Sequence, residues 1–131
     1  MKNYYISKAP HLICGSPAER EDFFNKEYEE IVQRISESDV LLCDAQALFY
    51  EFLNALSNGT VGKWRENLVN KKYILIDEFH WLETKNCILD ELTYIFQHTN
   101  ATIFLGTSNS VVEYDFGEGM NQFVSTERRR Q

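Results

Sequence analysis

Short, mostly apolar runs alternate with amphipathic segments along most of this chain, and a glycine or a polar residue follows each run. The runs are residues 11–14, 40–43, 73–76 and 101–105. They are continuous rather than alternating with polar residues, as in strands buried on both faces of a parallel sheet. Strand–helix alternation of this kind predicts an α/β fold with three layers and a parallel sheet of four or five strands.

The helical segments between the runs carry clear start and stop signals. Ser16, Pro17 and Glu19 form the pattern of a capping box with proline at the first helical position. Asp44 is placed to cap a second helix, which Asn58 and Gly59 should end. A shorter amphipathic piece at 61–69 and a third long helix that ends near Phe96 complete the set; their apolar residues recur at helical spacing.

Length and composition limit the functions open to this chain. Its 131 residues predict a single domain, in which residues 111–131 are an irregular tail or hold one short strand near Phe123 and Val124. The net charge of -7 opposes nucleic acid as a partner, and we interpret the basic cluster Arg128–Arg130 as a solvated tail.

The cysteines and the absence of apolar stretches bear on location. There are 3 cysteines in no metal-like spacing, which suits a reducing compartment, and Cys14 and Cys43 are interpreted as small hydrophobic residues. The sequence shows neither a signal peptide nor a stretch long enough to span a membrane. We therefore expect a cytoplasmic protein.

The third apolar run ends on two adjacent acids, Asp77 and Glu78. Four apolar residues followed by Asp-Glu are typical of the Walker B motif of P-loop NTPases, where the Asp holds magnesium and the Glu polarises the attacking water. An acid at a strand end can also simply cap the next turn. Since ligands of parallel sheets bind at the carboxyl ends of strands, we expect Gly15, Asp44, the acidic pair and residues 107–109 to lie along one edge.

The segment from residue 41 to 109, which begins LLCDAQ and ends LGTSN, resembles the central part of the bacterial chromosomal replication initiator DnaA and its relatives, Hda-like regulators included. Shared features are the helix ALFYEFLNAL, a short basic amphipathic helix, the apolar-acidic strand and a strand ending in Thr-Ser plus a polar residue. The resemblance covers roughly residues 11 to 110. It implies a P-loop NTPase core of the AAA+ type, with Asp77 at the magnesium position, Glu78 polarising water and Asn109 as the first sensor of the terminal phosphate.

The chain departs from this family at the phosphate loop. Gly15 falls where the Walker A motif begins, but that motif needs a glycine, four residues and then Gly-Lys-Ser/Thr. In the last three positions this chain has Arg20, Glu21 and Asp22. Pro17 removes one backbone donor. Glu19, Glu21 and Asp22 are expected to place up to three negative charges in the first turn of the helix, where a phosphate would lie. The loop is degenerate, so we expect no ATP binding in the usual manner and no cofactor. Nor does the sequence show a counterpart of the family's lid or DNA-binding domain.

Two functions stay open at this point. The first is a non-catalytic regulator of replication initiation that binds an initiator, a helicase or a loader; Trp64, Phe79 and Trp81 are either anchors for that partner or core residues. The second is an enzyme that binds ATP and magnesium through the retained acids and Asn109. We expect Glu21 and Asp22 to crowd the same crevice as the acidic pair, which disfavours nucleotide.

Three weaker alternatives complete the list. Crowded carboxylates around Asp77 could form a divalent-metal site with oxygen ligands. The arginines at the C-terminus could contact DNA, although the net charge opposes this. The chain could also be a remnant without activity. His11, His80 and His98 are too dispersed to name a metal set, and each is interpreted as a polar surface or half-buried residue.

Overall fold

A parallel sheet with the strand order β2-β3-β4-β1-β5 forms the middle layer of the computed structural model, which describes residues 10–108 and 125–128. The strands are β1 (His11–Cys14), β2 (Val40–Asp44), β3 (Tyr73–Asp77), β4 (Thr102–Thr107) and β5 (Ser125–Arg128). The helices are α1 (Pro17–Val32), α2 (Ala45–Asn58), α3 (Val61–Val69) and α4 (Asn86–His98), with short 3-10 helices η2 (Glu37–Asp39) and η3 (Phe79–Leu82).

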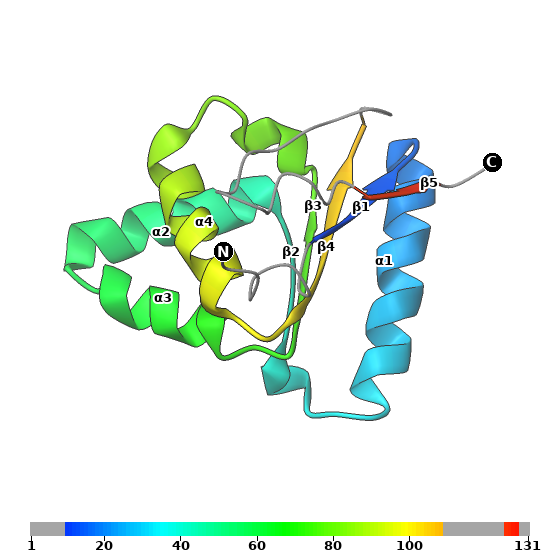
Figure 1. Cartoon of the computed structure of the whole chain (residues 1–131), viewed down its shortest axis with the longest axis horizontal. Coiled ribbons are helices and arrows are strands. Elements are labelled where there is room, and N and C mark those ends of the chain that lie inside the picture. Colours follow the sequence, from blue (N-terminus) through cyan, green and yellow to red (C-terminus); the bar gives the residue numbers. More distant parts are fainter. Residues whose placement is uncertain (1–9, 109–124, 129–131) are drawn as a thin grey trace, which may run out of the picture.

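The helices cover the two faces of the sheet unequally. Figure 1 shows α1 alone on one face and α2, α3 and α4 together on the other. The predicted three-layer α/β fold is therefore confirmed. The fifth strand begins at Ser125, just beyond the predicted Phe123 and Val124, which lie outside the described residues. Its four residues pair in parallel with β1.

The helix ends follow the signals in the sequence. The Asp44 carboxylate accepts a hydrogen bond from the Ala47 N–H (2.8 Å) and caps α2. That helix ends at Gly59, whose left-handed conformation (φ 70°) lets its N–H reach back to the last carbonyls. Local sequence thus sets the entry and exit of α2 without help from tertiary contacts.

The strands feed two separate cores because successive side chains point to opposite faces. Ile74 and Ile76 of β3 join the cluster under α2, α3 and α4, whereas Leu75 joins the cluster under α1. This double burial explains the continuous apolar runs. Phe79 is fully buried in the larger cluster, so it is not a surface anchor; Trp64 and Trp81 are half-buried against the same cluster.

The cysteines differ in their environment. Cys14 is buried, Cys43 is half-buried and Cys87 is exposed. Burial, aided by the negative charges of Glu51 and Asp44, raises the pKa of the Cys43 thiol to about 12, so it stays neutral in the folded protein. Within the described part of the chain, none of the helices has both the length and the apolar character needed to cross a membrane.

Candidate functional site

Four strands bring their carboxyl ends to one edge of the sheet. The register pairs Asp44 of β2 with Asp77 of β3, and Cys14 of β1 with Thr107 of β4. Because β4 lies between β3 and β1, the acidic pair and Gly15 stand on either side of it. A crevice at the carboxyl ends of parallel strands is where α/β folds bind ligands.

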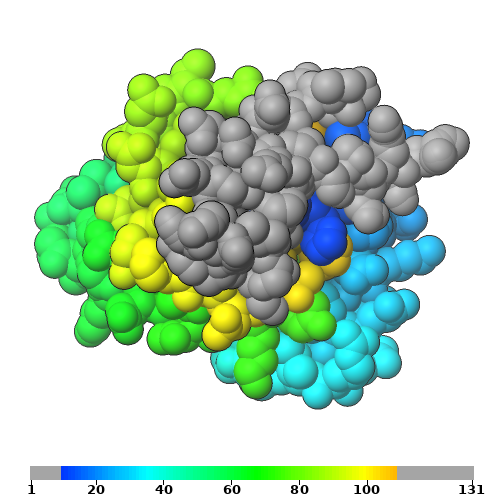
Figure 2. Space-filling model, viewed as in Figure 1, coloured from blue at the N-terminus to red at the C-terminus, as the bar shows by residue number. Residues whose placement is uncertain are grey.

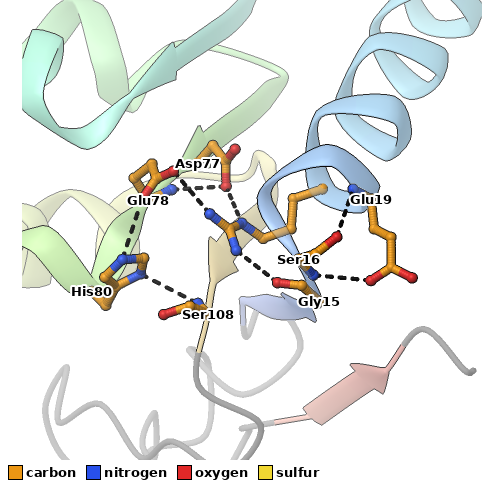
Figure 3. A network of polar contacts seen from close by, with 8 residues as sticks. Gly15, Ser16, Glu19, Asp77, Glu78, His80 and Ser108 are labelled. Atoms are coloured by element: carbon orange, nitrogen blue, oxygen red, sulfur yellow. Dashed lines mark hydrogen bonds and ion pairs between the residues drawn. The ribbon is translucent and has the colours of Figure 1, made fainter.

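Arg20 occupies this crevice. It lies on the first turns of α1, and its side chain is only 1% exposed. Its Nε donates to Asp77 Oδ1 (2.7 Å), its Nη2 donates to Glu78 Oε2 (2.9 Å), and its Nη1 donates to the Gly15 carbonyl (2.7 Å). Figure 3 shows this network of polar contacts. We call these four residues the arginine clasp, because one side chain joins the ends of β1 and β3.

The expectation that acids fill the crevice is wrong. Glu21 and Asp22 are exposed, while Arg20 shares the inward face of α1 with Phe24 and Ile31. Residues one and two positions along a helix are turned by about 100° and 200°, so neighbours in sequence point in different directions. The basic side chain therefore enters the site. The spacing of four between Arg20 and Phe24 was the available signal for its direction.

The start of α1 satisfies its own backbone, as the capping box predicts. Ser16 N–H donates to Glu19 Oε1 (2.9 Å), and Glu19 N–H donates to Ser16 Oγ (3.2 Å). Pro17 stands at the first helical position. Glu19 is the acid in the first turn; Glu21 lies beyond it, which corrects the expectation of several charges there. The helix start therefore needs no anion to complete it.

Glu78 adopts a left-handed backbone conformation (φ 58°, ψ 36°), which is uncommon for a residue with a side chain. Its N–H donates to Asp77 Oδ1 (2.8 Å), and its other carboxylate oxygen lies 3.2 Å from His80 Nε2. The strain, of about 1–2 kcal/mol, is held by contacts on both sides of the residue.

His80 extends the network to the end of β4. Its Nδ1 accepts a hydrogen bond from the Ser108 N–H (3.3 Å), so the proton of the neutral ring sits on Nε2 and faces Glu78. The sequence predicts His80 only as a polar surface or half-buried residue, and the side chain is half-buried. Its link to Ser108 joins η3 to the end of β4, two segments that are far apart in the sequence. Thr107 is buried, and Asn109, the expected sensor, lies outside the described residues.

Gly106 makes room for the clasp. A Cβ at this position would overlap Asp77 Oδ1 and come within 2.7 Å of the Phe24 ring. The Asp77 carboxylate therefore lies over the backbone of β4, and only glycine leaves space for it. In the sequence, Gly106 is recognisable only as the residue that ends an apolar run, and its role in making space for Asp77 depends on the fold.

The described residues do not provide the cluster of ligands that the proposed divalent-metal site would need. Among residues 10–108 and 125–128, no three His, Cys, Asp or Glu residues gather in a group able to hold a metal ion. Asp77 Oδ1 already accepts two hydrogen bonds, from Arg20 and from the Glu78 N–H.

The order and parallel pairing of the strands, with helices on both faces, define a three-layer α/β fold. This fold is shared with solved structures of DnaA. No protein-family model matches the sequence, and no curated protein matches it significantly.

The fold of this chain is similar to several solved structures. DnaA from Aquifex aeolicus in its AMPPCP-bound form matches with a TM-score of 0.78 at 17% identity, over 97% of this chain and 42% of that one. Domain III of the Thermotoga maritima replication initiation protein DnaA matches with 0.65 at 16%, over 76% and 43%. A DNA replication initiation factor matches with 0.68 at 19%, over 82% and 34%. The chain thus spans less than half of each.

The first prediction concerns the arginine clasp. Arg20→Met should lower the free energy of unfolding by about 3 kcal/mol, because it leaves two carboxylates close together without their partner. Adding Asp77→Asn and Glu78→Gln should restore part of this loss. Urea unfolding measures both effects.

Arg65 provides the matched control. It makes a two-pronged pair with Glu91 (2.8 and 3.0 Å), but its side chain is 34% exposed. Arg65→Met should therefore reduce the stability by only about 0.5 kcal/mol. Equal losses for the two arginines would show that burial gives the clasp no special weight.

The second prediction concerns Gly106. Gly106→Ala should destabilise the fold by about 1–3 kcal/mol, because the new methyl group displaces the Asp77 carboxylate. Gly62 on α3 is the control, since a Cβ there meets nothing within 4 Å. Gly62→Ala should stabilise the protein by up to about 1 kcal/mol. A Gly106→Ala protein as stable as the wild type would contradict the crowded geometry.

Proposed function

We propose that this chain is a non-catalytic, DnaA-like AAA+ domain that regulates or assists DNA replication initiation through protein contacts. The observation that carries the proposal is the arginine clasp. The guanidinium of Arg20 binds one carboxylate oxygen each of Asp77 and Glu78, the acids to which the resemblance gives a metal ion and a water molecule. The domain has the fold of a nucleotide-binding core, and a side chain of the same chain, Arg20, pairs with the acids at the strand end.

The residues present do not fit a magnesium–triphosphate. A divalent cation at Asp77 would meet the fixed positive charge of Arg20 at hydrogen-bond distance. A phosphate would compete for Arg20 with the acceptors that its three nitrogens already have in Asp77, Glu78 and the Gly15 carbonyl. No lysine follows Gly15 at the motif spacing, and the capping box occupies the helix start.

The partner class follows from the fold and the charge. The solved relatives are replication initiators, one of them bound to AMPPCP and single-stranded DNA. With a net charge of -7, this chain is poorly suited to nucleic acid, which favours a protein of the replication machinery: the initiator, a helicase or a loader. Such a role would place it in the cytoplasm.

The third prediction tests the clasp against the alternative of an ATP-binding NTPase. Magnesium and ATP at millimolar concentration should leave the melting temperature unchanged, whereas a ligand at 100 times its Kd would stabilise the fold by about 2.7 kcal/mol. The A. aeolicus DnaA, whose solved structure holds AMPPCP, is the positive control. A dose-dependent rise in melting temperature, or ATP hydrolysis lost in Glu78→Gln, would establish the alternative instead.

The fourth prediction tests the partner. The tagged chain should recover a replication initiator, helicase or loader from an extract of the organism that encodes it, and an unrelated acidic domain of similar size should not. Added ATP should not change the yield, because the proposal gives nucleotide no site. Recovery without any replication protein would count against the proposed function.

A further inference from the structure

The outer face of α2 is apolar although it is open to solvent. Of the four large apolar side chains that are exposed among the described residues, three lie on this helix: Tyr50 (53%), Leu53 (38%) and Leu56 (50%). Their spacing of three places them along one stripe. Glu51 is the one charged residue within the 14 residues of α2, in a chain that is 25% charged. Apolar side chains gathered on one exposed helix face make this face a candidate interaction surface.

Lysines flank this stripe on both sides. On the side of α3, Lys63 lines a groove of about 540 Å³ together with Glu51 and Asn54. On the side of η3, the Lys85 Nζ lies 6.0 Å from the centre of the Phe49 ring. Phe49 is one turn before Leu53, so this lysine stands beside the stripe.

Charge is unevenly distributed over the molecule. Residues 17–39, which include α1, carry eight acids against three bases, a net charge of -5. Helices α2 and α3 together carry two acids against two bases and are neutral. In Figures 1 and 2 these helices form the side of the molecule away from α1. An acidic partner would therefore be repelled by α1 and could approach α2 and α3.

We propose that an acidic amphipathic helix of a partner protein docks along α2. Its apolar side chains would cover Tyr50, Leu53 and Leu56, and its carboxylates would lie near Lys63 and Lys85. The inference rests on the proposed function and adds to it the surface and the chemistry of the partner. At a rise of 1.5 Å per residue, the 14 residues of α2 extend about 21 Å, which matches a helix of about four turns.

A synthetic peptide provides the probe. It is an amphipathic helix of about five turns, with leucine at every third and fourth position and glutamate elsewhere, carrying a fluorescent label. Fluorescence anisotropy at physiological ionic strength should show that it binds the full chain. Leu53→Glu with Leu56→Glu should abolish binding, because the stripe then carries two acids.

A pair of matched charge reversals tests the flanking lysines. Lys63→Glu with Lys85→Glu should weaken binding about tenfold more than Lys26→Glu with Arg34→Glu on α1. Both double variants change the net charge equally, so the difference reports position alone. Thermal unfolding confirms that each variant is folded.

Three results would overturn the inference. The acidic peptide could fail to bind, or bind all variants equally. A lysine–leucine peptide or single-stranded DNA could bind instead and be lost with the same substitutions. The free chain could form a dimer that Leu53→Glu with Leu56→Glu dissolves, which would make a second copy the occupant. If a replication protein is still recovered from the extract while the peptide fails, the proposed function stands and only this surface is wrong.

Discussion

A buried guanidinium must find acceptors for its donors, and the carboxyl-terminal edge of this sheet is arranged around that requirement. Arg20 has three acceptors, each from a different residue. They are the backbone carbonyl of Gly15 and the side-chain carboxylates of Asp77 and Glu78. The other unusual features of the edge serve the same contact. Gly106 leaves space for the carboxylate of Asp77. Glu78, whose carboxylate also binds Arg20, has a left-handed backbone conformation. The local conformations at this edge are thus coupled to a single charge.

This arrangement changes what the fold needs from its surroundings. Two adjacent acids at a strand end repel each other, and burial makes an unpaired charge costly. In a nucleotide-binding core a metal ion can supply the opposing charge, so occupancy and stability are linked. Here the opposing charge is covalently part of the chain, 57 residues away from Asp77 in sequence. The capping box likewise supplies from within the acceptors that an anion site would need from a ligand.

The sequence predicted the architecture well because the signals for it are local. Continuous apolar runs indicate doubly buried strands, and Ser16, Asp44 and Gly59 mark helix ends through contacts within a few residues. The site was predicted only in outline. The acids at the end of β3 could be located by pattern, but the partner of those acids depends on which face of α1 points inward. The order of charged residues in a sequence does not show which side chains of a helix point inward. Glu21 and Asp22 were therefore expected in the crevice, and Arg20 was not. Gly106 was missed for a similar reason: the close approach it permits is made by a residue of another strand.

The arginine clasp also bears on how binding at α2 could be controlled. A nucleotide-dependent protein changes its affinity for a partner because the ligand binds one conformation better than another. Under the proposed function nucleotide has no site in this chain, so no such ligand shifts its equilibrium. Its apolar stripe on α2 would then be presented at all times, and the fraction of partner bound would follow concentration and affinity alone. The uneven charge becomes important in that setting. Eight acids in residues 17–39 repel acidic partners from one side, while the neutral helices α2 and α3 leave the other side open to them. Selectivity in such a domain rests on surface charge and shape, which are fixed by the sequence, rather than on a bound state that can be switched.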